Sequence, residues 1–179
     1  MVTYQEVLDF WFAPENRSKH FVKDEPFDQI IRDRFFRVWQ EACQNRLFDW
    51  QENLEGCLAV IILLDQFSRN MFRDSARAFE QDEAALVLAR KMIADSSFSE
   101  LPLDYRLAAL MPFMHAENQA VQEQSVDLFE RFGDEKKLKY ARLHKEIIDR
   151  FGRFPHRNRV LGRKSSSEEI VYLSEFTGF

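Results

Sequence analysis

Residues 54–67 read LEGCLAVIILLDQF, and this stretch decides the fold class. Its apolar run, Cys57 to Leu64, covers every side of a helix rather than one stripe, which is typical of a helix buried all round. Asn53, just before it, can cap the helix by accepting a backbone N–H. A run this short cannot span a bilayer. The stretch therefore predicts a central, buried helix from Leu54 to about Phe67.

The segments on either side have helical patterns with one apolar face. Thr3 and Glu6 form a capping box, which predicts a short helix that ends near Phe12. Asp24, followed by Pro26, opens a longer helix that reaches about residue 45. Further helices are predicted over residues 79–94, 117–132 and 134–152. The chain is therefore predicted to be helical on both sides of its central helix.

Two local signals predict where the later helices break or begin. A helix that starts near Asp104 is expected to break or kink at Pro112, which pushes Met111 toward an extended conformation. Ser165 and Glu168 fit a second capping box, which predicts a short terminal helix.

The composition supports one all-helical domain over residues 1–179. Five glycines and five prolines are too few for the many turns of a β-sandwich, and no useful strand alternation occurs. Short links between helices favour antiparallel neighbours, so we expect an all-α fold of stacked antiparallel helices or a helical bundle. The 18 phenylalanines predict an aromatic-rich core.

The net charge and the two cysteines limit which classes of binding partner and which cellular compartment we expect. A net charge of −5 argues against nucleic acid and against an anionic membrane as partners. Cys43 and Cys57 form no Cys-x-x-Cys pair, and the first residues show no secretion signal. We therefore expect a cytoplasmic protein whose oligomeric state the sequence leaves open.

Residues 150–164, RFGRFPHRNRVLGRK, form a basic segment with five arginines, one lysine and no acid. Gly152, Pro155 and Gly162 prevent one regular helix, and the phenylalanines keep the segment out of free solution. Desolvated guanidinium groups need anionic or carbonyl partners. The segment therefore predicts contact with an acidic face of the protein, a bound anion or another chain.

Four motifs in order along the chain carry a resemblance to a known family: VLDFWF at 7–12, LLDQFSRNMFR at 63–73, MPFMHAEN at 111–118 and FGRFPHRNRVLGR at 151–163. Together they resemble the bacterial "domain of unknown function 924" family over nearly the whole chain. The resemblance implies an all-helical, tetratricopeptide-like fold and no established activity. Ser68 stands where that family usually has proline, which bears on the rigidity of that turn.

The motifs contain three clusters of polar residues. Each cluster lies where a predicted helix ends or breaks, and backbone groups at such places lack hydrogen-bond partners. The clusters are Asp65, Gln66, Arg69 and Asn70; His115, Glu117 and Asn118; and Arg153, His156, Arg157, Asn158 and Arg163. One interpretation is structural: Asp65 and Glu117 accept bonds from Arg153 or Arg157, and the asparagines cap helix ends. Such a buried network fixes one arrangement of helices.

The other interpretation is a central pocket for a small anion. The clusters hold more arginines than acids, so at least two guanidinium groups would remain for a phosphate or carboxylate. The ligand-binding residues would be Arg153, Arg157, Asn158, Arg163, Asp65, Gln66, Arg69 and Asn70, with Arg73 as a further candidate. His156 or His115, oriented by Glu117 or Asp65, would act as general acid or base. No nucleophile motif is present, so binding is favoured over catalysis.

The same residues suggest three further functions. A metal site is disfavoured because His115 and Glu117 are two residues apart, and arginines nearby repel a divalent cation, although His144 and His156 could add ligands. An RNA-stacking surface over residues 151–159 conflicts with the acidic remainder. A helical scaffold for a protein partner is the main alternative. The sequence leaves open whether the protein uses a cofactor.

Overall fold

Helices make up all the regular structure in the computed structural model, which describes residues 2–176 and 178. The α-helices are α1 (Tyr4–Phe12), α2 (Glu25–Cys43), α3 (Leu54–Ile61), α4 (Ser68–Met71), α5 (Asp82–Ile93), α6 (Leu103–His115), α7 (Gln119–Phe132), α8 (Glu135–Phe151) and α9 (Ser167–Glu175). Short 3₁₀ turns are η1 (Arg17–Lys19), η2 (Asp49–Glu52), η4 (Ala76–Ala78), η5 (Ser96–Glu100) and η6 (Pro155–Arg157), and η3 (Ile62–Phe67) is a π-helix. The all-α prediction is confirmed.

The predicted central helix is the most buried part of the structure, since every residue from 56 to 68 is buried. Asn53 caps α3 as predicted, with its side-chain oxygen accepting the backbone N–H of Gly56 at 2.8 Å. Gly56 is required here because a Cβ at this position would lie 2.0 Å from the carbonyl oxygen of Trp50. The backbone of η2, which contains Trp50, therefore packs directly against the first turn of α3.

The central helix differs from the prediction in its second half, where it widens into the π-helix η3 and continues through α4 to Met71. A π-helix has i→i+5 hydrogen bonds and usually occurs as a single turn inserted in an α-helix, frequently at functional sites. All six residues of η3 are buried, including Asp65 and Gln66. The π turn therefore carries two polar side chains into the interior.

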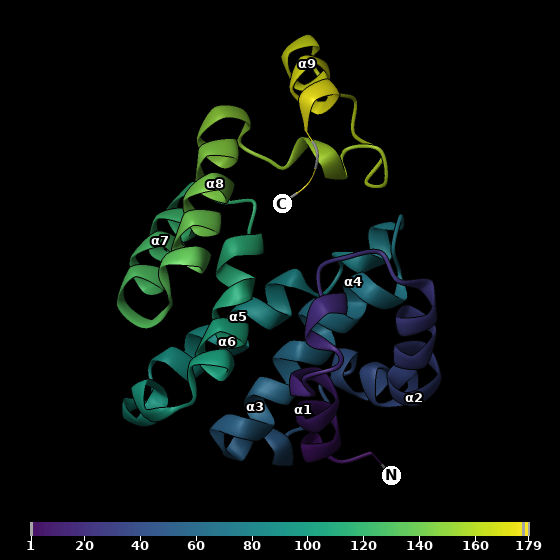
Figure 1. Cartoon of the computed structure of the whole chain (residues 1–179), viewed down its shortest axis with the longest axis vertical. Helices are drawn as coiled ribbons and strands as arrows, with labels where there is room; N and C mark the ends of the chain where they lie inside the picture. The colour runs from purple at the N-terminus through teal and green to yellow at the C-terminus, as the bar shows by residue number, and fades with distance from the viewer. Residues whose placement is uncertain (1, 177, 179) are drawn as a thin grey trace.

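The N-terminal half packs around an aromatic core, as predicted. Ring centroids of Phe10 in α1 and Phe35 in α2 lie 5.1 Å apart, and Phe67 at the end of η3 lies 5.0 Å from Phe35. Figure 1 shows α1, α2, α3 and α4 gathered on one side of the molecule. Burial of such large rings provides much of the stabilisation of a core, each fully buried ring contributing about 1.5–3 kcal/mol.

The prediction for Pro112 is wrong, because α6 runs from Leu103 through Pro112 to His115, and Met111 is helical. Pro112 lies within the last turn and its ring is buried in the core, so apolar packing offsets the lost backbone hydrogen bond. The helix ends instead at Ala116, which has an extended conformation. Gln122 Nε2 then donates to the carbonyl oxygens of Met114 and Ala116, each at 2.8 Å.

Helices α6, α7 and α8 are joined by links of three and two residues and pack as antiparallel neighbours (Figure 1). Asn118 caps α7 and Asp134 caps α8, each accepting a backbone N–H three residues on. Helix α8 ends at Gly152, whose φ of 68° is the left-handed conformation that favours glycine. Successive short links therefore produce the expected antiparallel stacking.

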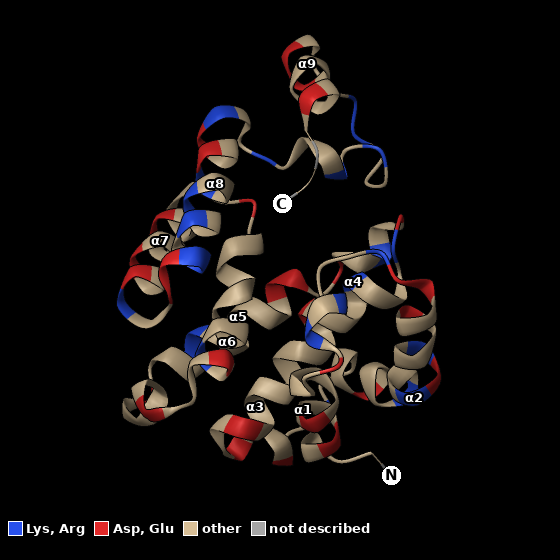
Figure 2. Ribbon diagram, in the orientation of Figure 1, with Lys and Arg blue, Asp and Glu red and all other residues tan. Residues whose placement is uncertain are grey.

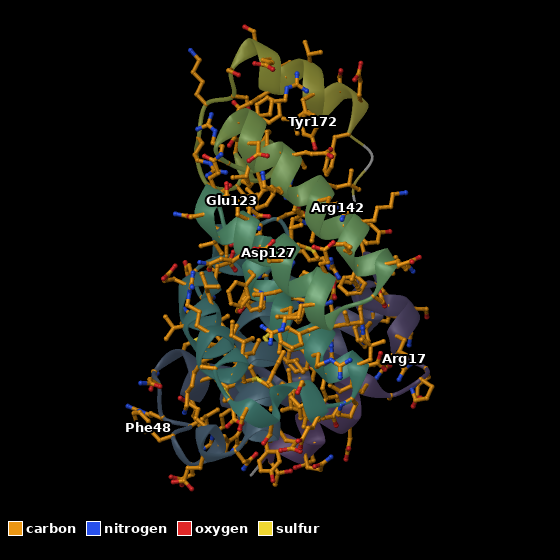
Figure 3. All side chains as sticks on the ribbon, turned by 90° about the vertical axis from the view of Figure 1, so that its left-hand side faces the viewer. Arg17, Phe48, Glu123, Asp127, Arg142 and Tyr172 are labelled. Atoms are coloured by element: carbon orange, nitrogen blue, oxygen red, sulfur yellow. The ribbon has the colours of Figure 1, made fainter. Side chains whose placement is uncertain are left out.

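The C-terminal part, residues 152–176, packs on the end of α8 through a separate apolar cluster. Ile147, Ile148 and Phe154 form its buried centre, and Phe151 contacts Tyr172 at a ring-centroid distance of 5.1 Å. Figure 3 shows Tyr172 near the junction of α9 and α8.

The predicted capping box at Ser165 and Glu168 is wrong by one residue, since Ser166 and Glu169 form it. Glu169 is the residue held by Arg153, while Glu168 pairs with Arg150 on the surface. Residues 165–168 and 166–169 both fit the capping-box pattern, and the ion pair between Arg153 and Glu169 distinguishes between them. Within the described part of the chain, none of the helices is both long and apolar enough to traverse a bilayer.

Candidate functional site

A cleft of about 400 Å³ lies where the basic segment meets the helical body. The lining residues are Lys23, Arg69, Arg73, Asp74, Ala78, Phe79, His115, His144, His156 and Arg157. Four of these side chains are cationic and one is acidic. Figure 2 shows the blue residues of the loop between α8 and α9 on the side that faces α4. The structure therefore brings residues of all three predicted clusters to one cleft: Arg69 from the first, His115 from the second, and His156 and Arg157 from the third.

Asp65 contacts two of the lining residues, Arg69 and His115, and is fully buried on the π-helix η3. One carboxylate oxygen accepts a hydrogen bond from His115 Nδ1 at 2.7 Å and lies 3.0 Å from Arg69. The other accepts from Gln66 Nε2 at 2.6 Å. Burial alone would raise the pKa of Asp65, but the Arg69 and His115 interactions lower it to about 2. Asp65 is therefore an ionised carboxylate with both oxygens engaged.

His115 ends α6 and borders the cleft. Because ionised Asp65 can only accept hydrogen bonds, His115 Nδ1 carries the proton and donates it. Burial and the charge of Arg69 keep the pKa of His115 below its ordinary value, although Asp65 opposes this shift. A neutral ring with a proton on Nδ1 has its lone pair on Nε2. His115 is therefore a hydrogen-bond acceptor at neutral pH.

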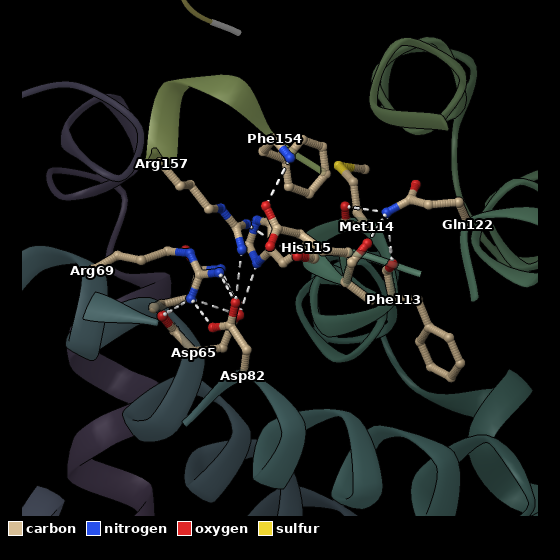
Figure 4. Close-up of polar contacts among 12 residues, drawn as sticks. Asp65, Arg69, Asp82, Phe113, Met114, His115, Gln122, Phe154 and Arg157 are labelled. Atoms are coloured by element: carbon tan, nitrogen blue, oxygen red, sulfur yellow. Dashed lines mark hydrogen bonds and ion pairs between the residues drawn. The ribbon is translucent and has the colours of Figure 1, made fainter. Parts of the chain in front are cut away.

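Asp82 belongs to none of the predicted clusters, and it connects Arg69 of the first cluster with Arg157 of the third (Figure 4). It is the first residue of α5 and accepts two bonds from Arg69, at 2.8 and 3.0 Å. The same carboxylate accepts a bond from Arg157 at 3.1 Å. Burial would lower the pKa of Arg69, but Asp65 and Asp82 raise it overall. Arg69 and Arg157 thus share one carboxylate, and Arg69 donates two of the three hydrogen bonds to it.

Arg157 has the poorest charge compensation of the predicted arginines. Its side chain is only 6% exposed, and besides Asp82 it contacts the carbonyl oxygen of His115 at 3.0 Å. Its Nε is buried and has no hydrogen-bond acceptor among the described residues. The guanidinium lies between the rings of Phe79 and Phe154, at 4.5 and 4.6 Å from their centroids. Burial and the neighbouring Arg69 charge lower the pKa of Arg157 to about 10.

Glu117 anchors a second group of contacts outside the cleft. Its carboxylate accepts two bonds from Arg163, at 2.6 and 2.9 Å, and one from the backbone N–H of Phe154 at 2.7 Å. Burial would raise the pKa of Glu117, but the Arg163 and Phe154 bonds lower it. Arg163 also donates to the carbonyl oxygen of Phe154 at 3.1 Å. These contacts fix residues 154–163 against the loop after α6.

Of the other predicted site residues, Arg153, Asn158 and Asn70 are not among the residues that line the cleft, whereas Arg73 lines it. Arg153 is paired with Glu169 through two bonds of 2.7 and 2.8 Å. Asn158 donates to Ser165 Oγ at 3.0 Å. Asn70 donates to the buried Asp28 at 2.7 Å, and Arg73 forms a bidentate pair with the same carboxylate.

Two predictions about pairing are wrong. Asp65 and Glu117 were expected to accept bonds from Arg153 or Arg157, but they pair with Arg69 and Arg163. At least two guanidinium groups were expected to have no carboxylate, but each predicted arginine has one, because Asp28, Asp82 and Glu169 supply the acids that the sequence analysis did not count.

Two further histidines border the cleft. His144, on α8, contacts the carbonyl oxygen of Tyr140 through Nδ1 at 2.8 Å, and burial lowers the pKa of His144 to about 3. His156 stacks on Phe176 at a centroid distance of 5.4 Å. Desolvation, followed by the charge of Arg157, lowers the pKa of His156. Both rings are neutral at neutral pH.

The described residues do not bring together a metal-ligand set. His115 faces Asp65 and Glu117 faces Arg163, so the two side chains point to different partners. Among residues 2–176 and 178, no group of three or more histidine, cysteine, aspartate or glutamate side chains could hold a metal ion.

Comparison with known proteins places this arrangement in a family. Residues 7–177 match the family described as "Bacterial protein of unknown function (DUF924)". The chain belongs to the DUF924 family. A solved structure, "Structure of Protein of Unknown Function ATU0120 from Agrobacterium tumefaciens", is similar over 97% of each chain, with 38% sequence identity and a TM-score of 0.88. No curated protein matches this DUF924 chain.

Proposed function

We propose that the cleft of this DUF924 protein binds a small anionic ligand, a phosphate or a carboxylate, with Arg157 as the principal contact. The observation that carries the proposal is the incomplete compensation of Arg157, which shares Asp82 with Arg69 and has a buried Nε without an acceptor among the described residues. An anion that completes the hydrogen bonds of a desolvated guanidinium group stabilises it.

The other cleft residues support the same class of ligand. Lys23, Arg73 and Arg157 are donors around a single lining acid, Asp74. Burial lowers the pKa values of the lining histidines, so the positive charge of the cleft comes from its lysine and arginines. A volume of about 400 Å³ falls in the range of small-molecule sites. The ligand would therefore be a small metabolite rather than a polymer. The proposal includes the cytoplasmic location expected from the sequence.

Of the residues expected to supply acid or base chemistry, His115 has the most suitable geometry. Asp65 orients its ring, and Nε2 is the nitrogen available for proton transfer. Glu117 is engaged by Arg163 and by a backbone N–H, so it is a structural residue in this proposal. His156 borders the mouth of the cleft and would contact the ligand.

The alternative is a helical scaffold in which these residues are structural and a protein partner binds elsewhere. The observation in its favour is that each predicted arginine already contacts a carboxylate. The alternative predicts that small anions leave the stability unchanged.

A thermal-shift experiment separates the two functions. Phosphate, sulfate, acetate and citrate are titrated at constant ionic strength, with sodium chloride as the reference. Phosphate or a carboxylate at about 100 times its Kd should raise the free energy of unfolding by about 2.7 kcal/mol. The Arg157→Met variant should lose this response and Arg163→Met should keep it. A wild-type protein that responds to none of the anions contradicts the proposed function.

A further inference from the structure

The Asp65–His115 pair has a consequence for the chemistry of the ligand, and this step rests on the proposed function. Lys23, Arg73 and Arg157 present only hydrogen-bond donors to the cleft. His115 presents an acceptor, because its Nδ1–H is directed to Asp65 and its Nε2 carries the lone pair. A simple anion, which has only acceptor oxygens, can satisfy the cations but not this nitrogen.

The orientation of the His115 ring is held firmly. Asp65 lies on the π-helix, is fully buried, and receives bonds from Gln66 and Arg69 as well as from His115. A carboxylate fixed in this way determines which nitrogen of the partner imidazole carries the proton, as in other carboxylate–histidine pairs. Rotation of the ring or transfer of the proton to Nε2 would leave Asp65 with one donor fewer. The acceptor character of Nε2 is thus built into the buried network.

The residue that carries this acceptor is in contact with the principal cation. Arg157 donates to the backbone carbonyl oxygen of His115 at 3.0 Å, so the two residues are in direct contact. Arg157 and His115 lie close together in the close-up of Figure 4, so a ligand bound to Arg157 would lie near His115.

We infer that the ligand is a hydroxylated anion, in which a phosphate or carboxylate group contacts Arg157 and a nearby hydroxyl group donates a hydrogen bond to His115 Nε2. Hydroxy acids and phosphates of polyols or sugars have this chemistry. The acceptor on His115, which lines the cleft, selects them, because an analogue that lacks the hydroxyl cannot donate to this nitrogen.

Matched pairs of ligands test this inference by calorimetry: 2-hydroxypropionate against propionate, and 2-hydroxyethyl phosphate against ethyl phosphate. In each class that binds, the hydroxylated member should bind roughly fivefold more tightly to the wild-type protein. The advantage should disappear in His115→Phe, which keeps an aromatic ring without the acceptor. The two pairs distinguish a carboxylate from a phosphate ligand.

The outcomes separate the inference from the proposed function. Equal affinity within each pair, or the same preference in His115→Phe, overturns the hydroxyl inference while anion binding stands. Failure of all four ligands to bind overturns both. If His115→Phe does not fold, ¹⁵N NMR of the wild-type imidazole decides: the Nε2 signal of His115 should be that of an unprotonated nitrogen and should shift with the hydroxylated member only. A protonated Nε2 at neutral pH contradicts the inference.

Discussion

Arg157 and Arg163 come from the same basic segment, and they illustrate two different uses of a guanidinium group. Both have a buried Nε without an acceptor among the described residues. Arg163 forms a bidentate pair with its own carboxylate, Glu117, and contacts the carbonyl oxygen of Phe154. Arg157 has one bond to a carboxylate that it shares with Arg69. Only Arg157 borders the cleft.

The comparison shows that an unpaired Nε alone does not indicate a binding site. What distinguishes Arg157 is the combination of burial, a shared counter-charge and access to the cleft. Arg163 is a structural residue that fixes the basic segment. Arg157 has no carboxylate of its own, so an anion can neutralise its positive charge.

Paired arginine variants should give the largest difference. Arg163→Met should lower the free energy of unfolding by about 3 kcal/mol, because it leaves the half-buried Glu117 carboxylate without its counter-ion. Arg157→Met should cost only about 1 kcal/mol, because Asp82 keeps both bonds from Arg69 and the desolvation of Arg157 is relieved. Urea denaturation measures both values. Equal losses for the two variants would mean that Arg157 is a structural residue like Arg163.

The pH dependence of stability should reflect the neutral histidines on the cleft side. The folded-state pKa of His144, about 3, lies below its ordinary value of 6.5, so protonation favours the unfolded chain. The stabilisation is complete above the unfolded-state pKa and is lost as the pH falls toward the folded value.

Between about pH 7 and about pH 5 the loss from His144 alone should be about 2 kcal/mol. Glu117, with its lowered pKa, should contribute only at more acidic pH. Denaturation curves of wild type and His144→Gln measure the difference, and the variant should show a flatter profile. Identical slopes for the two proteins would contradict a buried, neutral His144.

Local signals in the sequence predicted much of the helical framework. The caps at Thr3, Asp24, Asn53 and Asp134 are observed because each depends on residues within a few positions of one another. The buried central helix followed from its uniformly apolar sequence. The π-helix could not be predicted, because the residues of η3 also suit an ordinary α-helix.

The candidate site was predicted less completely. The polar clusters were found because they interrupt apolar patterns, but Asp28, Asp82 and Glu169 resemble ordinary acids in the first turn of a helix. Their role depends on long-range contacts, such as that between Asp82 and Arg157, 75 positions apart. The count of acids against arginines was therefore wrong, although two residues of the clusters, His115 and Arg157, line the same cleft.

Asp82 provides a way to sharpen the comparison between the two arginines. Asp82→Asn should lower the free energy of unfolding by about 1.5 kcal/mol, because two guanidinium groups lose a charged partner. Phosphate should then stabilise the variant more than it stabilises the wild type, since the anion replaces the missing charge. Thermal unfolding with and without phosphate measures this effect. A smaller phosphate effect in the variant would place the anion away from Arg157.

A surface ion pair of the same segment should have the smallest effect. Arg159 and Asp74 form a pair at 2.9 Å, with 76% and 61% of their side chains exposed. Arg159→Gln should change the free energy of unfolding by less than about 0.5 kcal/mol, because exposed pairs are screened by solvent. Urea denaturation at low and high salt checks this value. A loss near that of Arg163→Met would show that the segment is held by its surface charges.

Anion binding at Arg157 can be observed by ¹⁵N NMR of the arginine Nε–H groups during a phosphate titration. Signals of Arg157 and Arg163 are assigned by their absence from the two methionine variants. The account predicts a saturable shift of the Arg157 signal, with the Arg163 signal unchanged. Equal shifts of both signals, or no shift of Arg157 at phosphate concentrations that raise the melting temperature, would contradict it.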